Sequence, residues 1–188
     1  MSDLAVVIDS VGFGYTKNHP VLKDVSIHVP RGNGLILKII FFQKGNVCSI
    51  VGAVYCLLGS NGCGKTTLLN ILLGRIQPQQ GSIQVLGTKV EANNGHQLNH
   101  LIGYMPQHIA LIPGMDIEET FFYFARVNHV RDRGFVLKRI QSYLHMLGLT
   151  NAKQFVWQLS GGQKRLLSLG VTLIYEPAVL LLDEPTVS

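Results

Sequence analysis

The sequence predicts an α/β domain built on a mostly parallel sheet with helices on both faces, an N-terminal antiparallel β subdomain and a helical insert. Short apolar runs alternate with segments whose leucines recur at helical spacing, which favours parallel strands joined by helices. A helical stretch, residues 116–150, separates two segments that carry glycine-rich loops. With 188 residues, 47% of them hydrophobic and 14% charged, the chain is suited to one sizeable core rather than to disorder.

The N-terminal half contains the first predicted strands. Residues 4–15 and 21–30 alternate between apolar and polar side chains around a Lys-Asn-His-Pro turn, which predicts an antiparallel hairpin. Residues 53–59 are nearly all apolar and suit a strand buried on both faces. Residues 65–76 have helical spacing, and residues 81–90 predict a second pair of strands.

The C-terminal half is expected to begin with a buried strand at 101–107 that ends in a loop. Asp116, followed three residues later by Glu119, indicates a capping box at a helix start, and Gly134 is expected to break the helical stretch. Helices are expected at 121–127, at 136–149 and after 160, and a last strand at 178–183.

Charge, cysteine content and hydropathy exclude several classes of protein. The net charge of +5 is mild, and the basic residues are scattered pairs typical of solvated faces, so no nucleic-acid partner is expected. The three cysteines are odd in number, lack metal-ligand spacing and indicate reduced cytosolic thiols. No signal peptide is recognised, and the longest apolar zone, residues 35–59, is broken by Lys38 and Lys44, so it does not predict a membrane span. The basic pairs are Arg131 with Arg133, Lys138 with Arg139, and Lys164 with Arg165, and the cysteines are Cys48, Cys56 and Cys63.

The stretch "GSNGCGKT", residues 59–66, matches G-x-x-x-x-G-K-[ST] between a predicted strand and a predicted helix. Its glycines allow backbone N–H groups to approach phosphate oxygens, and the helix N-terminus favours negative charge. Lys65 can reach the β- and γ-phosphates, and the Thr66 hydroxyl can bind Mg²⁺. This context favours a P-loop NTPase fold with ATP and Mg²⁺ as cofactors over an ordinary glycine turn. The nucleotide-binding residues predicted here are Gly59, Ser60, Asn61, Gly62, Cys63, Gly64, Lys65, Thr66 and Thr67, with Lys65 also catalytic.

Cys63 is expected to be a reactive thiol, because Lys65 and the helix N-terminus both favour the thiolate. A buried and inert cysteine is the alternative.

An acidic pair follows the last apolar run. Asp183 is expected at the carboxyl end of a buried strand, where it can hold Mg²⁺, and the adjacent Glu184 can accept a proton from an attacking water. A helix cap is the alternative for such a pair, but beside a P-loop the catalytic interpretation is favoured.

The stretch "LSGGQ", residues 159–163, predicts a second anion site at a helix N-terminus. Ser160 can cap the helix, and Gly161 and Gly162 leave its first N–H groups open. One nucleotide does not need two such sites from one chain, so two chains facing head to tail are expected, with Ser160, Gly161, Gly162 and Gln163 meeting the nucleotide of the other chain. A simple Ser-Gly-Gly cap is the alternative.

The P-loop, "GYMPQ", "LSGGQ" and "VLLLDEPT", in this order, closely resemble the ATP-binding cassette of ABC transporters. The resemblance covers nearly the whole chain and is greatest to the G and H subfamilies, especially insect members. It implies an ATPase that powers transmembrane transport of lipid or other hydrophobic cargo. It also implies a second cassette and a membrane domain as partners, and a location at the cytoplasmic face of a membrane.

The resemblance also assigns roles by position. Tyr15 matches the aromatic residue that stacks on adenine, although a core or turn tyrosine is the alternative. Gln107 matches the loop glutamine that touches Mg²⁺ and senses the membrane domain, with a polar strand end as the alternative. The predicted metal ligands are therefore Thr66, Gln107 and Asp183, and residues 108–165 would form the helical subdomain that carries "LSGGQ".

The chain departs from the family pattern in two places. Residues 33–52 form an insertion, because removing them joins "VPRG" to "AVYCLLG" as in family members. Two hypotheses are open: an artefact of the gene model, such as a translated intron, or a β-hairpin around "QKGN" that bulges from a loop. The other departure is the end of the chain, because the resemblance implies further strands and a γ-phosphate histidine beyond it.

We therefore expect residues 1–188 to be a partial nucleotide-binding domain, a truncated fragment that hydrolyses ATP negligibly. The alternative functions are a soluble ABC ATPase of translation or DNA repair, and a non-catalytic truncated product.

Overall fold

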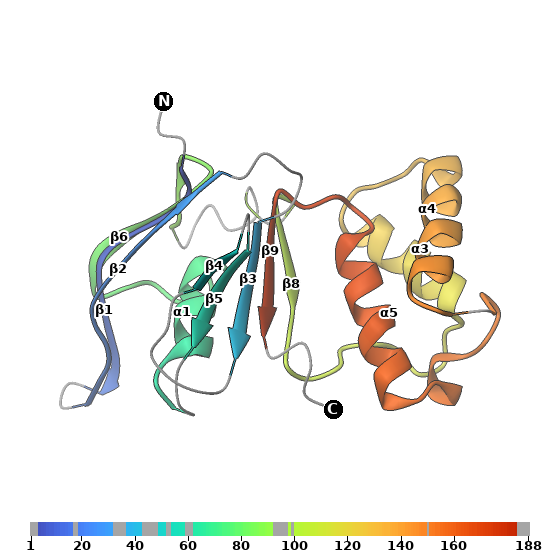
Figure 1. Cartoon of the computed structure of the whole chain (residues 1–188), viewed down its shortest axis with the longest axis horizontal. Helices are drawn as coiled ribbons and strands as arrows, with labels where there is room; N and C mark the ends of the chain where they lie inside the picture. The colour runs from blue at the N-terminus through green and yellow to red at the C-terminus, as the bar shows by residue number, and fades with distance from the viewer. Residues whose placement is uncertain are drawn as a thin grey trace.

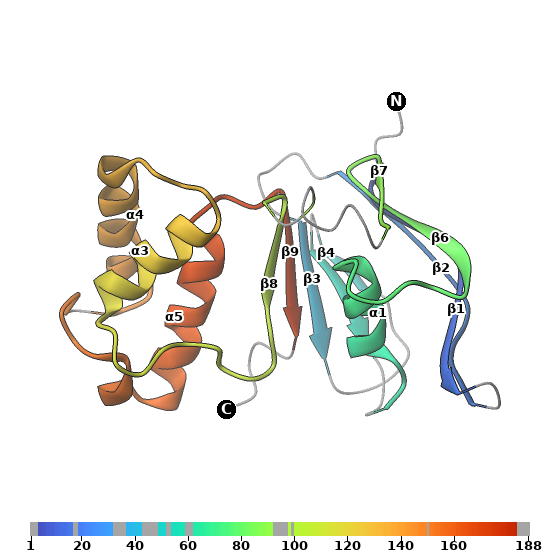
Figure 2. The same ribbon diagram turned by 180° about the vertical axis from the view of Figure 1, so that it is seen from behind.

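The computed structural model describes residues 4–16, 19–31, 37–42, 49–51, 54–58, 62–91, 98, 100–149 and 151–183. An antiparallel sheet, a mainly parallel sheet and a helical region lie side by side in that order (Figure 1). Figure 2 shows the same order from behind, with α1 between the two sheets.

The antiparallel sheet begins with the predicted hairpin. β1 pairs with β2 from Leu4 opposite Pro30 to Thr16 opposite His19. The other edge of β1 pairs with β6, and β7 turns back on β6, so the second predicted strand pair joins the same sheet. Its order is β2-β1-β6-β7, with β1 at Leu4–Thr16, β2 at His19–Pro30, β6 at Gln80–Val85 and β7 at Thr88–Lys89.

The second sheet has the order β4-β5-β3-β9-β8. β3, β5, β8 and β9 are parallel to their neighbours in this group, whereas β4 is antiparallel to β5 at the edge. The carboxyl ends of β3 and β9 lie at the lower edge in Figure 1. The strands are β3 (Leu37–Phe42), β4 (Ser49–Val51), β5 (Val54–Leu58), β8 (Ile102–Met105) and β9 (Val179–Asp183).

Helices cover both faces of this sheet, as the sequence predicted. Side chains on a strand alternate between its two faces, and all of β9 is buried. Val179 and Leu181 belong to the core that includes Leu69 of α1 (Lys65–Leu72). Leu180 and Leu182 belong to a separate cluster against which Leu169 and Leu173 of α5 (Gly161–Leu173) pack. β9 is therefore covered from both sides, which accounts for its uninterrupted apolar sequence.

The helical region has its own core and contains α3 (Ile117–Val127), α4 (Arg133–Met146), the 3₁₀ helix η1 (Val156–Gln158) and α5. The predicted capping box is present, because the Asp116 carboxylate accepts from the backbone N–H of Glu119 while Asp116 donates its own N–H to the Glu119 carboxylate. The expected break at Gly134 is wrong. Asp132 caps α4 by accepting from the N–H of Phe135, so Gly134 lies inside the first turn of the helix.

The described parts of the predicted insertion, residues 37–42 and 49–51, do not form the bulging hairpin that was one of the two hypotheses. Its strands β3 and β4 lie on opposite sides of β5, and β3 occupies the place between β5 and β9. Five residues of β3 are in register with β5 and five with β9. An apolar stretch placed in this way is paired along both edges, whereas a hairpin at the surface would leave strand edges open.

Candidate nucleotide-binding site

The described part of the P-loop, residues 62–66, turns into α1 with the backbone that its glycines predict. Gly62 and Gly64 have φ values of 82° and 97°, in the left-handed region that side chains disfavour. A Cβ on Gly64 would also lie only 2.8 Å from Leu22 Cδ2 and 2.9 Å from Val21 Cγ1. Gly64 is therefore fixed by backbone conformation and by the close approach of β2. Gly59, Ser60 and Asn61 lie outside the described residues.

Lys65 and Thr66 are the first two residues of α1. The Lys65 ammonium donates to Cys63 Sγ at 3.8 Å, and the Cys63 side chain is exposed. The hypothesis of a buried, inert Cys63 is therefore wrong as regards burial. Thr66 is exposed, and the next residue, Thr67, is buried.

Tyr15 lies beside this helix although it is 52 residues away in sequence. Its hydroxyl is 3.3 Å from Thr67 Oγ1, and its ring packs edge-on against Phe13 with 5.1 Å between centroids. The side chain is nonetheless 64% exposed, which contradicts the core alternative for this tyrosine. The sequence did not reveal Gln79, which holds Gly14, the residue before Tyr15. The Gln79 side-chain amide accepts from the N–H of Gly14 at 3.1 Å and donates to the Gly14 carbonyl at 2.9 Å.

Asp183 ends β9 as predicted and is only 3% exposed. Its charge reaches Tyr104 on the adjacent strand: burial raises the pKa of Tyr104, the Asp183 carboxylate raises it further, and Arg75 lowers it. The Arg75 guanidinium lies 5.0 Å from the centre of the Tyr104 ring. Glu184 lies outside the described residues.

Arg165 connects three parts of the site, and the sequence did not reveal it. Its guanidinium donates to the carbonyls of Pro106 at 2.9 Å, Gln107 at 2.7 Å and Asp183 at 3.1 Å. The residue is only 8% exposed, so interpreting it as part of a solvated basic pair was wrong. Arg165 thereby joins the loop of Gln107 and the end of β9 to α5, and it places Gln107 and Asp183 in the same region.

Residues 159–163, called here the Ser160 corner, begin α5. The Ser160 hydroxyl accepts from the N–H of Gln163 at 3.2 Å, and the Gln163 side chain accepts from the N–H of Ser160 at 2.9 Å. A Cβ on Gly161 or Gly162 would meet nothing within 4 Å, so the start of the helix faces open space. The corner and the start of α1 lie on opposite sides of the parallel sheet but at the same lower edge in Figure 1.

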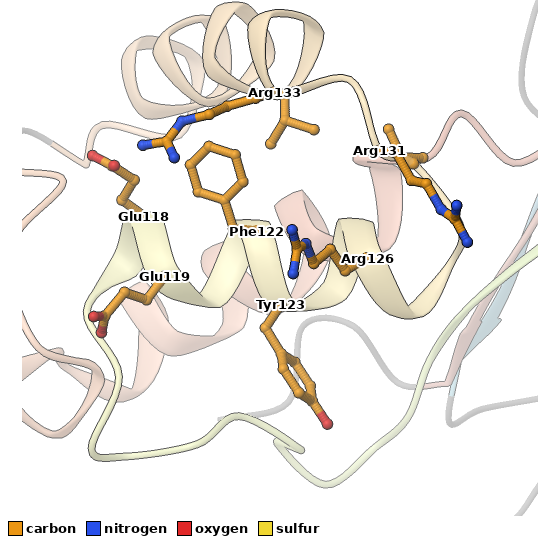
Figure 3. Close-up of a pocket in the computed structure, with 9 residues that line it drawn as sticks. Glu118, Glu119, Phe122, Tyr123, Arg126, Arg131 and Arg133 are labelled. Carbon is orange, nitrogen blue, oxygen red and sulfur yellow. The ribbon is translucent and has the colours of Figure 1, made fainter.

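A cleft of about 410 Å³ lies elsewhere, on the surface between α3 and α4 (Figure 3). Phe122 and Arg133 face each other across it, with the guanidinium carbon 5.3 Å from the ring centre. Its lining includes no residue of the P-loop, the Ser160 corner or β9, so it is distinct from the predicted nucleotide site.

The fold and these residues define a P-loop nucleotide-binding domain. The family model "ABC transporter" matches residues 44–187. The chain belongs to the ABC transporter family.

Similar proteins agree with this assignment. The chain is 37% identical over 145 residues to ABC transporter G family member 23 of Dictyostelium discoideum, covering 77% of this chain and 20% of that protein. It is 33% identical over 173 residues to the ABC transporter ATP-binding protein YtrE of Bacillus subtilis, covering 89% of this chain and 65% of that protein. The solved structure of cbiO1 from Clostridium perfringens, part of the ABC transporter complex cbiONQ, has a TM-score of 0.75 at 24% identity and covers 98% of this chain and 67% of that one. That likeness confirms the P-loop NTPase fold.

The chain spans about a fifth of the length of the G-family relatives from Dictyostelium, 20% and 18%. Among the described residues, no helix has both the length and the apolar character needed to cross a bilayer.

Proposed function

We propose that this chain binds Mg-ATP as the nucleotide-binding domain of a transporter. The observation that carries the proposal is the position of Tyr15 beside α1, because it brings an exposed aromatic ring to the helix that begins with Lys65. An aromatic side chain offers a stacking face to a purine, and the P-loop offers backbone N–H groups and an ammonium to phosphates. One edge of the molecule thus carries groups for both ends of a nucleotide.

The oxygen groups near this edge have the chemistry that Mg²⁺ prefers. Thr66 supplies a hydroxyl, Gln107 a side-chain amide oxygen and Asp183 a carboxylate, and hard oxygen donors are the usual ligands of Mg²⁺. The Arg165 hydrogen bonds hold the backbone of Gln107 and Asp183 in one region, which supports a shared role. When bound, Mg²⁺ would neutralise charge on the phosphates. Lys65 would hold the β- and γ-phosphates, and Glu184 would orient and deprotonate the attacking water.

We further propose that the longer protein is an ATPase in which two cassettes close head to tail on two nucleotides. The capped Ser160 corner supports this, because nothing in the described part of the chain lies within 4 Å of a Cβ built on Gly161 or Gly162, and α5 lies on the other side of the parallel sheet from α1 (Figure 1). Closure would drive a membrane domain at the cytoplasmic face of a membrane. Lipid or other hydrophobic cargo, and membership of the G or H subfamily, rest on the sequence resemblance and on relatives named as G family members.

A soluble ATPase of translation or DNA repair is the second candidate. A non-catalytic product that only occupies a partner cassette is the third. The sequence of the longer protein separates the first two, because several apolar spans of about 20 residues indicate a transporter, whereas a second cassette without such spans indicates the soluble class.

Equilibrium dialysis of purified residues 1–188 with Mg-ATP tests nucleotide binding. Lys65→Ala should abolish binding. Tyr15→Ala should weaken it about 5- to 150-fold, since base stacking contributes about 1–3 kcal/mol, whereas Tyr15→Phe should retain most of the affinity. Tyr123→Ala, which removes a tyrosine 44% exposed on α3, is the matched control and should have no effect. Equal affinity in all four variants would contradict the assignment of the site.

We also expect residues 1–188 to hydrolyse ATP negligibly. Phosphate release by the purified chain, measured with and without Lys65→Ala, tests this. Rapid turnover that the substitution abolishes would refute it.

A further inference from the structure

Two large aromatic side chains are exposed immediately before the Ser160 corner. Trp157 is 62% exposed and Phe155 is 42% exposed. Their rings stack on each other with an interplanar angle of 21° and 6.5 Å between centroids. They form an exposed pair of nearly parallel rings, called here the aromatic platform, whose exposure the hydrophobic effect alone would disfavour.

The backbone that carries the platform is fixed by buried neighbours and by hydrogen bonds. Val156, between the two aromatic residues, and Leu159, just after them, are 2% and 4% exposed and belong to the core of the helical region. The Gln158 side chain accepts from the N–H of Phe155 at 3.0 Å, and the N–H of Trp157 donates to the carbonyl of Pro113 at 3.2 Å. Because the backbone is anchored in this way, the rings are presented outward without the cost of ordering a loose loop.

The platform and the Ser160 corner are parts of one surface. Trp157 precedes Ser160 by three residues, and three residues span at most about 10 Å. A triphosphate and a ribose separate the γ-phosphate of ATP from its base by a comparable length. A nucleotide whose phosphate end met the Ser160 corner would thus have its base within reach of the aromatic platform.

We propose that Phe155 and Trp157 stack on the adenine of the nucleotide held by the facing cassette. In each cassette, Tyr15 would stack on the adenine of the nucleotide bound to that cassette, and the aromatic platform would stack on the adenine of the nucleotide bound to the partner. This inference rests on the proposed head-to-tail pairing and adds a base-recognition surface to a corner that otherwise contacts only phosphates. A purine suits the platform better than an aliphatic side chain, because both faces in contact are flat and aromatic.

Trp157 is the single tryptophan of the chain, so its fluorescence reports on the platform alone. Two variants are mixed in the presence of Mg-ATP. One carries Trp157→Phe, which leaves it without tryptophan but with a functional P-loop. The other carries Lys65→Ala, which leaves it unable to hold ATP but with Trp157 in place. We expect loss of Trp157 fluorescence in the mixture, because its indole stacks on adenine held by the other chain.

The control replaces the first variant with the double variant Trp157→Phe, Lys65→Ala, which should leave the fluorescence unchanged. The second measurement is the ATP concentration that gives half-maximal dimer in sedimentation velocity. Trp157→Ala should raise it about tenfold and Trp157→Phe should raise it little, while Tyr123→Ala should leave it as in the unmodified chain.

The outcomes separate this inference from the function on which it rests. If ATP drives dimer formation but the fluorescence of Trp157 is unchanged and Trp157→Ala has no effect, the platform has another occupant and the inference is overturned. If ATP does not bind, or binds without forming a dimer, the nucleotide-binding or head-to-tail proposal fails instead, and the platform inference falls with it.

Discussion

Replacing Arg165 with methionine should destabilise the domain severely. Methionine resembles the aliphatic stem of arginine but lacks the guanidinium, so the substitution removes the hydrogen bonds to the carbonyls of Pro106, Gln107 and Asp183 while keeping the apolar contacts of the stem. Removing one partner from a buried polar network leaves the other partners unsatisfied, and this is the costly direction of change.

The size of the effect follows from the three acceptors. Hydrogen bonds to charged groups contribute about 1.5–3 kcal/mol each, which gives an upper range of about 4.5–9 kcal/mol. Gln107 is exposed and Pro106 half-buried, so water can satisfy their carbonyls in the variant. Asp183 is 3% exposed, so its carbonyl has less access to water. We therefore expect a loss of about 3–5 kcal/mol, a large share of a typical stability of 5–15 kcal/mol.

Urea unfolding of residues 1–188, followed by far-UV circular dichroism, measures this loss. At about 2 kcal/mol per molar urea, the midpoint should fall by about 1.5–2.5 M. Tryptophan fluorescence is a poor probe here, because Trp157 is already 62% exposed in the folded chain. Arg165→Lys keeps the charge but not the fork of donors, so its midpoint should lie between those of the unmodified chain and Arg165→Met.

The matched control is Lys138→Met, which removes an exposed basic residue from α4 and should change stability by less than about 0.5 kcal/mol. If Arg165→Met were no less stable than this control, Arg165 would not hold the loop, the strand and the helix together, and our interpretation of its hydrogen bonds would be incorrect.

Three further predictions concern other parts of the chain. Burial raises the pKa of Tyr175 to about 12 in the folded chain, against about 10 when unfolded, so the contribution of Tyr175 to stability should be constant below pH 10 and should fall by about 2–3 kcal/mol as the pH rises from 10 to 12. Tyr175→Phe should remove this part of the pH dependence of the free energy of unfolding, measured by urea unfolding at each pH between 10 and 12. The same pH dependence in the variant and the unmodified chain would contradict the prediction. Alkylation of the exposed Cys63 should block ATP binding, and ATP should protect the thiol, as measured by mass spectrometry; modification that leaves affinity unchanged would separate Cys63 from the phosphates. Deleting residues 33–52 should abolish soluble folding of this chain by removing β3, and a deletion variant as stable as the parent would support the artefact hypothesis.

Features that depend on neighbouring residues could be predicted from the sequence. The capping boxes at Asp116 and Ser160 each join residues three positions apart, so the residue types and their spacing are enough to predict these helix starts. The hairpin of β1 and β2 and the helix after the P-loop are local in the same sense. The position of Asp183 followed from the uninterrupted apolar run of β9, because only a strand covered on both faces needs one.

Features that depend on distant partners could not be predicted in this way. Arg165 follows Lys164 on α5, and such a pair is typical of a solvated face, but its acceptors Pro106 and Gln107 lie 59 and 58 residues away. Gln79 lies 65 residues from the Gly14 backbone that it fixes. Every residue has a backbone carbonyl, so the sequence does not show which carbonyl accepts a hydrogen bond from a distant side chain.

The position of β3 connects residues 33–52, the predicted insertion, with the predicted nucleotide site. β5 leads toward the P-loop, and β9 ends at Asp183. β3 lies between these two strands and is parallel to both. Neighbouring strands are about 4.8 Å apart, so one intervening strand separates β5 from β9 by about 10 Å. If β5 and β9 paired directly, the strand that leads to the P-loop and the strand that ends at Asp183 would be about half as far apart. We therefore expect removal of residues 33–52 to change the spacing between the predicted phosphate-binding and Mg²⁺-binding groups, and so to disturb nucleotide binding as well as folding.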